Sequence, residues 1–219
     1  QTEDPAEARK RGGKSVLRPD IVRIVTPGTI TEEPLLDSAR ANHLAAIAIL
    51  RGGTEAALAS IDVSTGELQV RATSAGSFRL HAAALSLAEL VVADEAPPTE
   101  EWRIALAEVA RETPLARQPA AHFDSRSGER RLAESFGARA VEAFGEFSRA
   151  ELSALGALFS YVSLTQVGRL PALKTPKRSA DGAVMLIDAA TRASLEILAA
   201  QSGGRDGSLV AAIDRTVTG

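Results

Sequence analysis

Three short apolar runs follow one another in the first half of the chain, each joined to the next by a tight turn. The runs cover residues 43–50, 56–63 and 67–73, and the turns between them are Arg51-Gly52-Gly53-Thr54 and Ser64-Thr65-Gly66. Gly-containing turns of this length join antiparallel neighbours. The sequence therefore predicts a three-stranded meander, and any fold for this chain has to be built around it.

Helices and one further strand are expected after the meander. Residues 89–93 form an apolar run of the kind buried in a mixed sheet, and apolar periodicity predicts helices over 77–88, from Trp102 to Val109 and over 123–167. The chain holds 41 Ala, while only 4% of its residues are aromatic. Much of its apolar surface is therefore expected to be shallow packing between helices, and helix should outweigh strand.

Two elements are expected before the meander. The β-branched run 21–25 predicts a strand that ends in the turn Thr26-Pro27-Gly28-Thr29. Thr31 is a candidate N-cap with acidic residues in the next turn, which predicts a short helix to about Ala41. Residues 1–20 are polar and charged without apolar periodicity, which indicates a loop or the end of a preceding domain.

The composition changes over residues 168–182, which hold two Gly, two Pro and a run of basic residues. This change predicts a domain boundary. After it, Asp188 is the expected cap of a helix that carries Leu195 and Leu198 and ends at Gly203-Gly204. Ser208 is expected to begin another helix, so that the last segment is all-helical.

Several functional classes are excluded by composition. The formal net charge is −3, which does not fit a protein with a wholly basic DNA-coating surface, and the absence of Cys excludes disulfide frameworks and thiolate metal sites. No run of 18 apolar residues and no signal-peptide profile occurs, so we expect a soluble, cytoplasmic chain without membrane contact. The sequence begins with Gln1 and has Met185 as its single Met, which leads us to expect a piece of a longer protein.

Carboxylates are the more serious candidates for chemistry. A meander with Asp62 in its second strand is similar to the first strands of ribonuclease-H-like folds, in which acidic residues bind paired Mg²⁺. Glu89, Asp94 and Glu151 are the conceivable partners in such a site. The alternative is local, because Asp62 before Ser64 can accept backbone hydrogen bonds in an ordinary turn.

The remaining polar candidates are weaker. His43, His81 and His122 lie far apart in sequence and near no nucleophile motif, so we expect them at helix surfaces or core edges. Trp102 and the Phe residues are expected to pack in the core, because they lack the basic interleaving of a base-stacking platform. Phosphate contact is a hypothesis for two basic patches, which hold Arg9, Lys10, Arg11 and Lys14 in one and Arg169, Lys174, Lys177 and Arg178 in the other.

Six stretches of the chain carry a resemblance to one protein family. In order, they are Val22–Thr29, Asn42–Ile47, Ile61–Glu67, Thr165-Gln166, Ile187–Glu196 and Asp214–Thr218. On these residues the chain resembles the MutS family of DNA mismatch repair proteins, and the resemblance runs over essentially its whole length. Each pattern alone is weak, but six in the right order and spacing are a specific signal.

The resemblance implies a place within a larger protein. Residues 1–29 would be the tail of the mismatch-recognition domain, 30–172 the connector domain and 173–219 the start of the helical core. The implied fold class is α/β, with a ribonuclease-H-like, non-catalytic connector of mixed sheet and flanking helices, followed by an all-helical segment. The implied role is structural and signal-transmitting, with a surface for a MutL-like protein. The rival hypothesis is a metal-dependent nuclease or resolvase built around Asp62.

The resemblance also assigns activities to the parent that this chain lacks. The family's Phe-x-Glu mismatch motif has no match outside Phe144-Gly145-Glu146, which lies deep in the connector region and is interpreted as chance. ATP and Mg²⁺ binding, mismatched duplex DNA binding and homodimer formation are accordingly expected of the parent protein. We expect no catalytic residue, cofactor or metal in this chain.

Nucleotide binding gives the first test. Gly13-Lys14-Ser15 resembles the end of a phosphate-binding loop, but the Gly required five places earlier is Ala8, so backbone amides cannot converge on phosphate oxygens. We expect no saturable heat when Mg-ATP is titrated into the chain at micromolar concentration. A saturable calorimetric isotherm would contradict this expectation.

Overall fold

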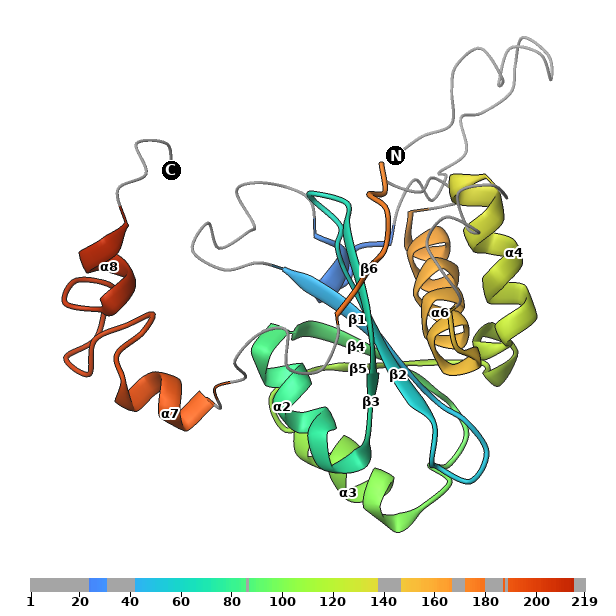
Figure 1. Cartoon of the computed structure of the whole chain (residues 1–219), viewed down its shortest axis with the longest axis horizontal. Helices are drawn as coiled ribbons and strands as arrows, with labels where there is room; N and C mark the ends of the chain where they lie inside the picture. Colours follow the sequence, from blue (N-terminus) through green and yellow to red (C-terminus); the bar gives the residue numbers. More distant parts are fainter. Residues whose placement is uncertain are drawn as a thin grey trace, which may run out of the picture.

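A six-stranded mixed sheet forms the centre of the structure (Figure 1). The computed structural model describes residues 24–30, 42–85, 87–137, 147–166, 172–179, 187 and 189–214. The strand order is β5-β4-β1-β2-β3-β6. The strands are β1 His43–Ile49, β2 Ala56–Asp62, β3 Glu67–Thr73, β4 Leu87–Ala93, β5 Leu115–Gln118 and β6 Lys177–Arg178.

The predicted meander is confirmed. Strand β2 pairs antiparallel with both β1 and β3, in a register that places Asp62 opposite His43 on one side and Glu67 on the other. Strand β4 pairs parallel with β1, β5 pairs parallel with β4, and β6 pairs parallel with β3. The predicted α/β class with a mixed sheet is therefore correct, although β5 and β6 were not predicted.

Helices cover both faces of the sheet. Helices α4 (Ser125–Phe136) and α6 (Arg149–Thr165) lie on one face, and α2 (Ala75–Leu85) and α3 (Glu100–Val109) lie on the other. The alternation of each strand divides the apolar residues between them. The α6 face holds a core that includes Leu44, Ile61, Val70 and Leu158, and the α2–α3 face holds one that includes Ile47, Leu58, Phe78 and Trp102.

Helix α6 is the most buried helix in the described part of the chain, with 13 buried residues over its 17 positions. Small side chains let α4 approach it closely. A Cβ on Gly128 would lie 2.0 Å from the carbonyl oxygen of Leu152, and one on Gly156 would lie 2.7 Å from Cα of Gly128. The expected shallow packing between helices is thus realised where α4 crosses α6.

The prediction of helix over 123–167 is confirmed for most of its described residues, and the structure adds where the separate helices begin. A short 3-10 helix, η3 (Ala120–Phe123), comes first, and α4 and α6 follow as separate helices. Asp124 caps α4 by accepting from the Ser127 amide, and Ser148 caps α6 by accepting from the Glu151 amide. The motif Ser148-x-x-Glu151 is a capping box that marks a new helix start.

The strand predicted over 21–25 is also wrong for its described residues. Ile24 and Val25 belong to no strand, and the Ile24 amide donates to the Thr165 carbonyl at the end of α6, 2.8 Å away. The described end of this β-branched run therefore bonds to the end of a helix and does not join the sheet. The helix predicted over 31–41 lies outside the described residues.

The last described segment contains two short helices, α7 (Ala189–Ser194) and α8 (Leu209–Ile213), which Figure 1 shows beside the α/β part of the fold. The prediction that the first helix continues past Leu198 is wrong, because the chain turns at Glu196, whose φ is 49°. Leu195 and Leu198, which were expected to form the buried face of this helix, are more than half exposed. Ser208 caps α8 as predicted. The expected cap Asp188 lies outside the described residues.

In the part of the chain that the structure describes, we find no helix with the length and apolar character needed to cross a membrane.

The close crossing of α4 and α6 gives a stability prediction. Gly128→Ala places a methyl group against the Leu152 carbonyl, and overpacking of this kind lowers the free energy of unfolding by about 2 kcal/mol. Gly76→Ala in α2 is the matched control, because the nearest atom would be 4.0 Å away. Urea unfolding should show the loss for Gly128→Ala alone, and equal midpoints for the two variants would contradict the predicted clash.

Candidate functional site: buried carboxylates that anchor the ends of the α/β fold

Glu89 in β4 is a buried carboxylate, 5% exposed, that accepts three hydrogen bonds. Its Oε1 accepts from the Tyr161 hydroxyl of α6 at 2.7 Å. Its Oε2 accepts from the Thr26 hydroxyl at 2.6 Å and from the Gly28 amide at 3.1 Å. Because Thr26 and Gly28 belong to residues 24–30, which we call the entering segment, Glu89 joins that segment to the sheet and to α6.

The sequence of the entering segment fits this role. Pro27–Thr29 form a 3-10 turn, η1, in which Thr26 and Thr29 cap each other. A Cβ on Gly28 would lie 2.9 Å from Cβ of Glu89 and 2.8 Å from a methyl group of Leu44. Only glycine therefore lets the backbone amide reach the carboxylate, which explains the Thr-Pro-Gly-Thr turn physically.

The same contact alters the acidity of Tyr161. Burial, together with the hydrogen bond to Glu89, raises the pKa of Tyr161 to about 12, because ionisation would place a second negative charge beside a buried carboxylate. The hydroxyl of Tyr161 is therefore a donor throughout the neutral range. Sequence reasoning missed this partner, which lies 72 residues from Glu89.

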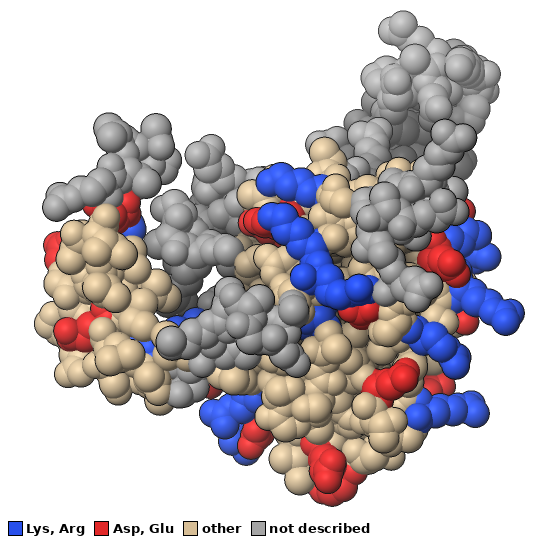
Figure 2. Space-filling model, in the orientation of Figure 1, with Lys and Arg blue, Asp and Glu red and all other residues tan. Residues whose placement is uncertain are grey.

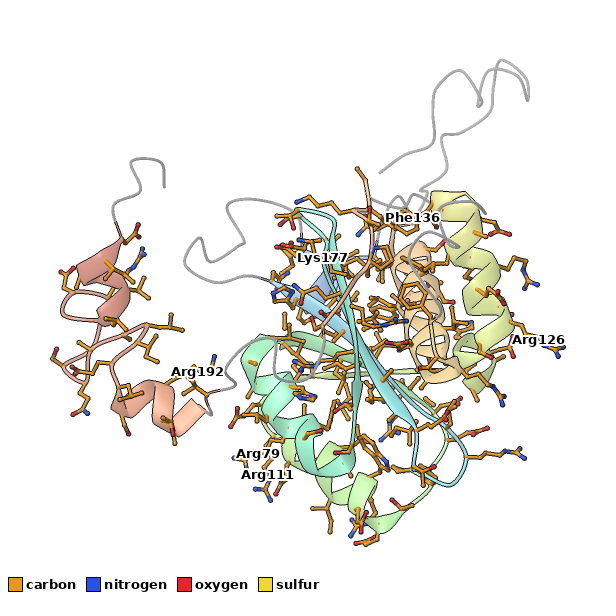
Figure 3. The ribbon with its side chains drawn as sticks, in the orientation of Figure 1. Arg79, Arg111, Arg126, Phe136, Lys177 and Arg192 are labelled. Atoms are coloured by element: carbon orange, nitrogen blue, oxygen red, sulfur yellow. The ribbon has the colours of Figure 1, made fainter. Side chains whose placement is uncertain are left out.

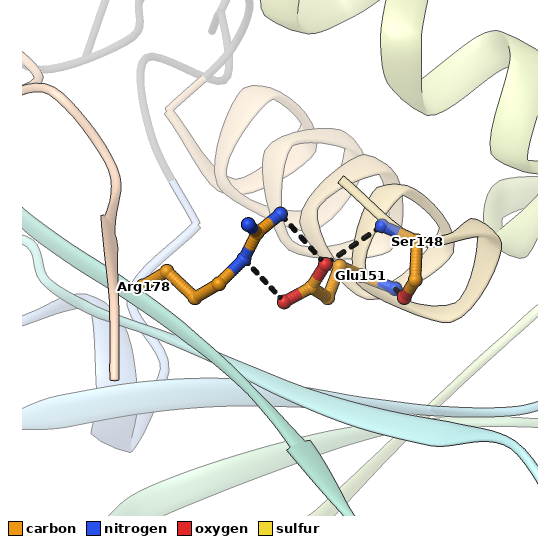
Figure 4. Close-up of polar contacts among 3 residues, drawn as sticks. All are labelled: Ser148, Glu151 and Arg178. Atoms are coloured by element: carbon orange, nitrogen blue, oxygen red, sulfur yellow. Dashed lines mark hydrogen bonds and ion pairs between the residues drawn. The ribbon is translucent and has the colours of Figure 1, made fainter. Parts of the chain in front are cut away.

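Glu151 anchors the other end of the fold (Figure 4). It is 5% exposed, and its Oε2 completes the α6 capping box by accepting from the Ser148 amide at 2.7 Å. Arg178 of β6 binds it in a two-point pair, with Nε 2.9 Å from Oε1 and Nη2 3.1 Å from Oε2. The guanidinium also lies 4.8 Å from the centre of the Phe147 ring. Residues 172–179, which we call the strap, are thereby tied to the start of α6.

Asp62 has a local role at the turn between β2 and β3. Its Oδ1 accepts from the Ser64 amide at 2.9 Å, the Ser64 hydroxyl at 2.5 Å and the Thr65 amide at 3.3 Å. Burial raises the pKa of Asp62, but the hydrogen bonds from Ser64 and Thr65 outweigh it and hold this pKa below its ordinary value. This is the turn-shaping alternative that the sequence left open.

His43 and Glu67 lie in the strands on either side of Asp62. Burial lowers the pKa of His43, and this effect exceeds the opposing attraction of Asp62 and Glu67. The Lys177 ammonium lies 3.0 Å from Glu67 Oε1 and holds the pKa of Glu67 below its ordinary value. The strap thus carries one exposed ion pair here and one partly buried pair at Glu151.

The four acids of the metal hypothesis do not converge. Asp62 follows Ile61, which faces α6, so the alternation of the strand points Asp62 to the opposite face. Glu89 and Glu151 lie on the α6 face with separate partners, and Asp94 is exposed beyond the other end of β4. Among the described residues, no group of three His, Cys, Asp or Glu side chains could hold a metal ion.

The basic patches are only partly within the described residues. Lys174, Lys177 and Arg178 lie on the strap, where Lys177 and Arg178 have carboxylate partners. Figure 2 shows basic side chains there with acidic side chains close by, and Figure 3 labels Lys177 beside the sheet. Arg169 and the patch with Arg9, Lys10, Arg11 and Lys14 lie outside the described residues, as do Gly13-Lys14-Ser15 and Phe144. Phosphate contact stays a prediction.

The other polar and aromatic expectations are mostly confirmed. Phe78, Trp102 and Phe159 are at most 2% exposed and belong to the core, as predicted. His43 and His122 are partly exposed, as expected for core edges. The expectation for His81 is wrong, because it is 2% exposed and its Nδ1 lies 2.9 Å from the Thr73 hydroxyl oxygen.

Comparison with known proteins identifies similar chains. Residues 42–174 match the family model for MutS domain II. The whole chain is 53% identical to a protein of Cereibacter sphaeroides and 48% identical to one of Azorhizobium caulinodans, each named DNA mismatch repair protein MutS. The chain spans only 24% of the length of these relatives.

Asp62 gives a prediction that separates turn shaping from metal binding. Asp62→Asn keeps a side-chain acceptor for the Ser64 and Thr65 amides, so the free energy of unfolding should fall by about 1 kcal/mol or less. Because the folded pKa of Asp62 is lowered, the wild-type advantage should be lost as the pH falls through that pKa. The melting temperatures of both proteins should be independent of millimolar Mg²⁺. A Mg²⁺-linked rise that disappears in the variant would support the nuclease hypothesis instead.

Tyr161 gives a spectroscopic prediction, because it is the single Tyr in the chain. Tyrosinate absorbance should titrate with a pKa of about 12, and Glu89→Gln should bring this pKa down toward the ordinary value near 10. Since the folded pKa is raised, the contribution of Tyr161 to stability is fully present below pH 10 and is lost between 10 and about 12. An unshifted wild-type titration would contradict the hydrogen bond to Glu89.

Proposed function

Because this chain belongs to the MutS domain II family, we propose that it is the connector of a DNA mismatch repair protein and works by transmitting conformational change between other domains. It is proposed to act as a structural element without catalytic activity of its own. Such a role needs a rigid body that passes a displacement from one attached segment to another.

The observation that carries the proposal is the anchoring of both ends on α6. The entering segment is bound to Glu89, whose other oxygen accepts from Tyr161 of α6. The strap is bound to Glu151, in the first turn of the same helix. Most residues of α6 are buried. A displacement of the entering segment and a displacement of the strap therefore act on the same closely packed unit.

The parent protein is proposed to carry the activities that this role would connect. These are the binding of mismatched duplex DNA, the binding and hydrolysis of ATP with Mg²⁺, and homodimer formation. A surface of this chain is proposed to contact a MutL-like protein in the cytoplasm. The support for this wider role is the name shared by the relatives, DNA mismatch repair protein MutS, and the identity over the whole of this chain.

The nuclease alternative has less support. It needs at least two of the acids Asp62, Glu89, Asp94 and Glu151 to approach a common metal ion. Asp62 and Glu89 lie on opposite faces of the sheet, and Glu89 and Glu151 are each held by donors from the protein itself.

The proposal is tested in the full-length parent. Tyr161→Phe removes one hydroxyl from the Glu89 contact and should leave mismatch binding and ATP hydrolysis near their wild-type values. The rate of ATP-induced release from a mismatched duplex should fall severalfold, because the entering segment is held less firmly. Asp94→Asn, which removes an exposed acid at the far end of β4, is the control and should release at the wild-type rate. Equal release rates in all three proteins would contradict a coupling role.

A further inference from the structure

The strap lies along the edge of the sheet and links α6 to the helical segment 189–214. The Lys174 amide donates to the Gly66 carbonyl at 2.8 Å, and the Ser179 amide donates to the Val70 carbonyl at 2.9 Å. Between these two bonds, β6 pairs with β3 at Gln69 and Val70. The strap is therefore held against β3 by backbone contacts from Lys174 to Ser179.

The start of the strap fits the turn that Asp62 shapes. Gly66 has a φ of 70°, and a Cβ at this position would lie 1.9 Å from the Ala172 carbonyl oxygen. No side chain other than hydrogen fits between the turn and the strap. The docked position of the strap is thus a specific one.

Side chains on the strap add two ion pairs of unequal strength. Lys177 and Glu67 are exposed, with 68% and 38% of their side chains accessible, so solvent and salt weaken their attraction. Arg178 binds the 6% exposed side chain of Glu151 at two points and covers Phe147. Because the buried carboxylate would lose its cationic partner if Arg178 left, this pair dominates the docking of the strap.

A second contact lies beyond the strap. Nη2 of Arg192 in α7 donates to the Ala83 carbonyl in the last turn of α2, at 2.7 Å, and Figure 3 shows Arg192 between the two helices. A cation at a helix C-terminus is favoured by the helix dipole, but one such bond is weak compared with a two-point buried pair. Of these two described contacts, the Arg178–Glu151 pair of the strap is therefore the stronger one.

We propose that the strap is a latch: the Arg178–Glu151 pair holds it on β3 and α6, and breaking that one pair frees the helical segment to move relative to the sheet. The capping box keeps α6 intact when the latch opens, since Ser148 and Glu151 retain their own contacts. The latch explains how the proposed coupling role is achieved, so it rests on that role for its use, although its opening is a property of this chain alone.

Hydrogen exchange in the 219-residue chain tests the latch. Arg178→Gln should speed exchange of the Lys174 and Ser179 amides at least tenfold while the amides of β1 and β2 keep their rates. Glu151→Gln should have the same effect and keep the capping box, because Gln replaces Glu in that motif. Arg103→Gln is the matched control, since Arg103 pairs with Glu100 on the exposed surface of α3.

Two spin labels give an independent readout of motion. The chain has no Cys, so single cysteines can be placed at exposed Ser135 in α4 and exposed Ser202 in the helical segment. The distribution of distances between the labels should be narrow in the wild type and the Arg103→Gln control. It should broaden in Arg178→Gln and Glu151→Gln.

Two results would overturn the latch. One is wild-type exchange of the strap amides in both variants, and the other is a uniform rise in exchange over the whole sheet, which would show that the strap does not open as a separate unit. These outcomes are distinct from failure of the coupling role. A latch that opens as described, in a parent whose ATP-induced release is insensitive to the Tyr161→Phe change, would leave the latch standing and reject the coupling.

Discussion

Helix α6 takes part in the contacts of two buried carboxylates, Glu89 and Glu151. These contacts hold the two ends of the α/β fold in place. Tyr161 in its last turns donates to Glu89, and Glu151 in its first turn binds Arg178. A carboxylate taken out of water is costly unless donors and cations surround it, so each acid fixes the segment that supplies its partners. The entering segment and the strap are therefore placed by electrostatics on a helix that apolar packing holds rigid.

The same acids are the reason why the sequence also suggests a metal-dependent nuclease. A ribonuclease-H-like sheet with Asp62, Glu89 and Glu151 has the residue types that a metal site needs. In the folded chain, each of these carboxylates instead accepts hydrogen bonds from amides, hydroxyls or a guanidinium of the protein itself. Strand alternation places Asp62 on the face opposite Glu89, and Glu89 and Glu151 each bind separate partners on the α6 face.

Local signals predicted much of the fold, because they act over a few residues. The meander followed from short Gly-containing turns, and the turn role of Asp62 followed from Ser64 two residues later. Tyr161 lies 72 residues from Glu89 and Arg178 lies 27 residues from Glu151, and no local pattern encodes these two contacts. The separate start of α6 had a visible signal in the capping box at Ser148, whereas the two-residue strand β6 is too short to show an apolar pattern.

In the described part of the chain, donors from the protein hold Asp62, Glu89 and Glu151 at separate places, and we expect these acids to share no metal ion. This expectation is tested most directly by adding Mn²⁺ to isotopically labelled protein and recording the backbone amide signals of Gly28, Ser64 and Ser179, one beside each anchored contact. We expect no selective paramagnetic broadening of these signals relative to exposed amides elsewhere. Strong broadening of two of them at substoichiometric Mn²⁺ would show a shared metal site and contradict the anchoring role.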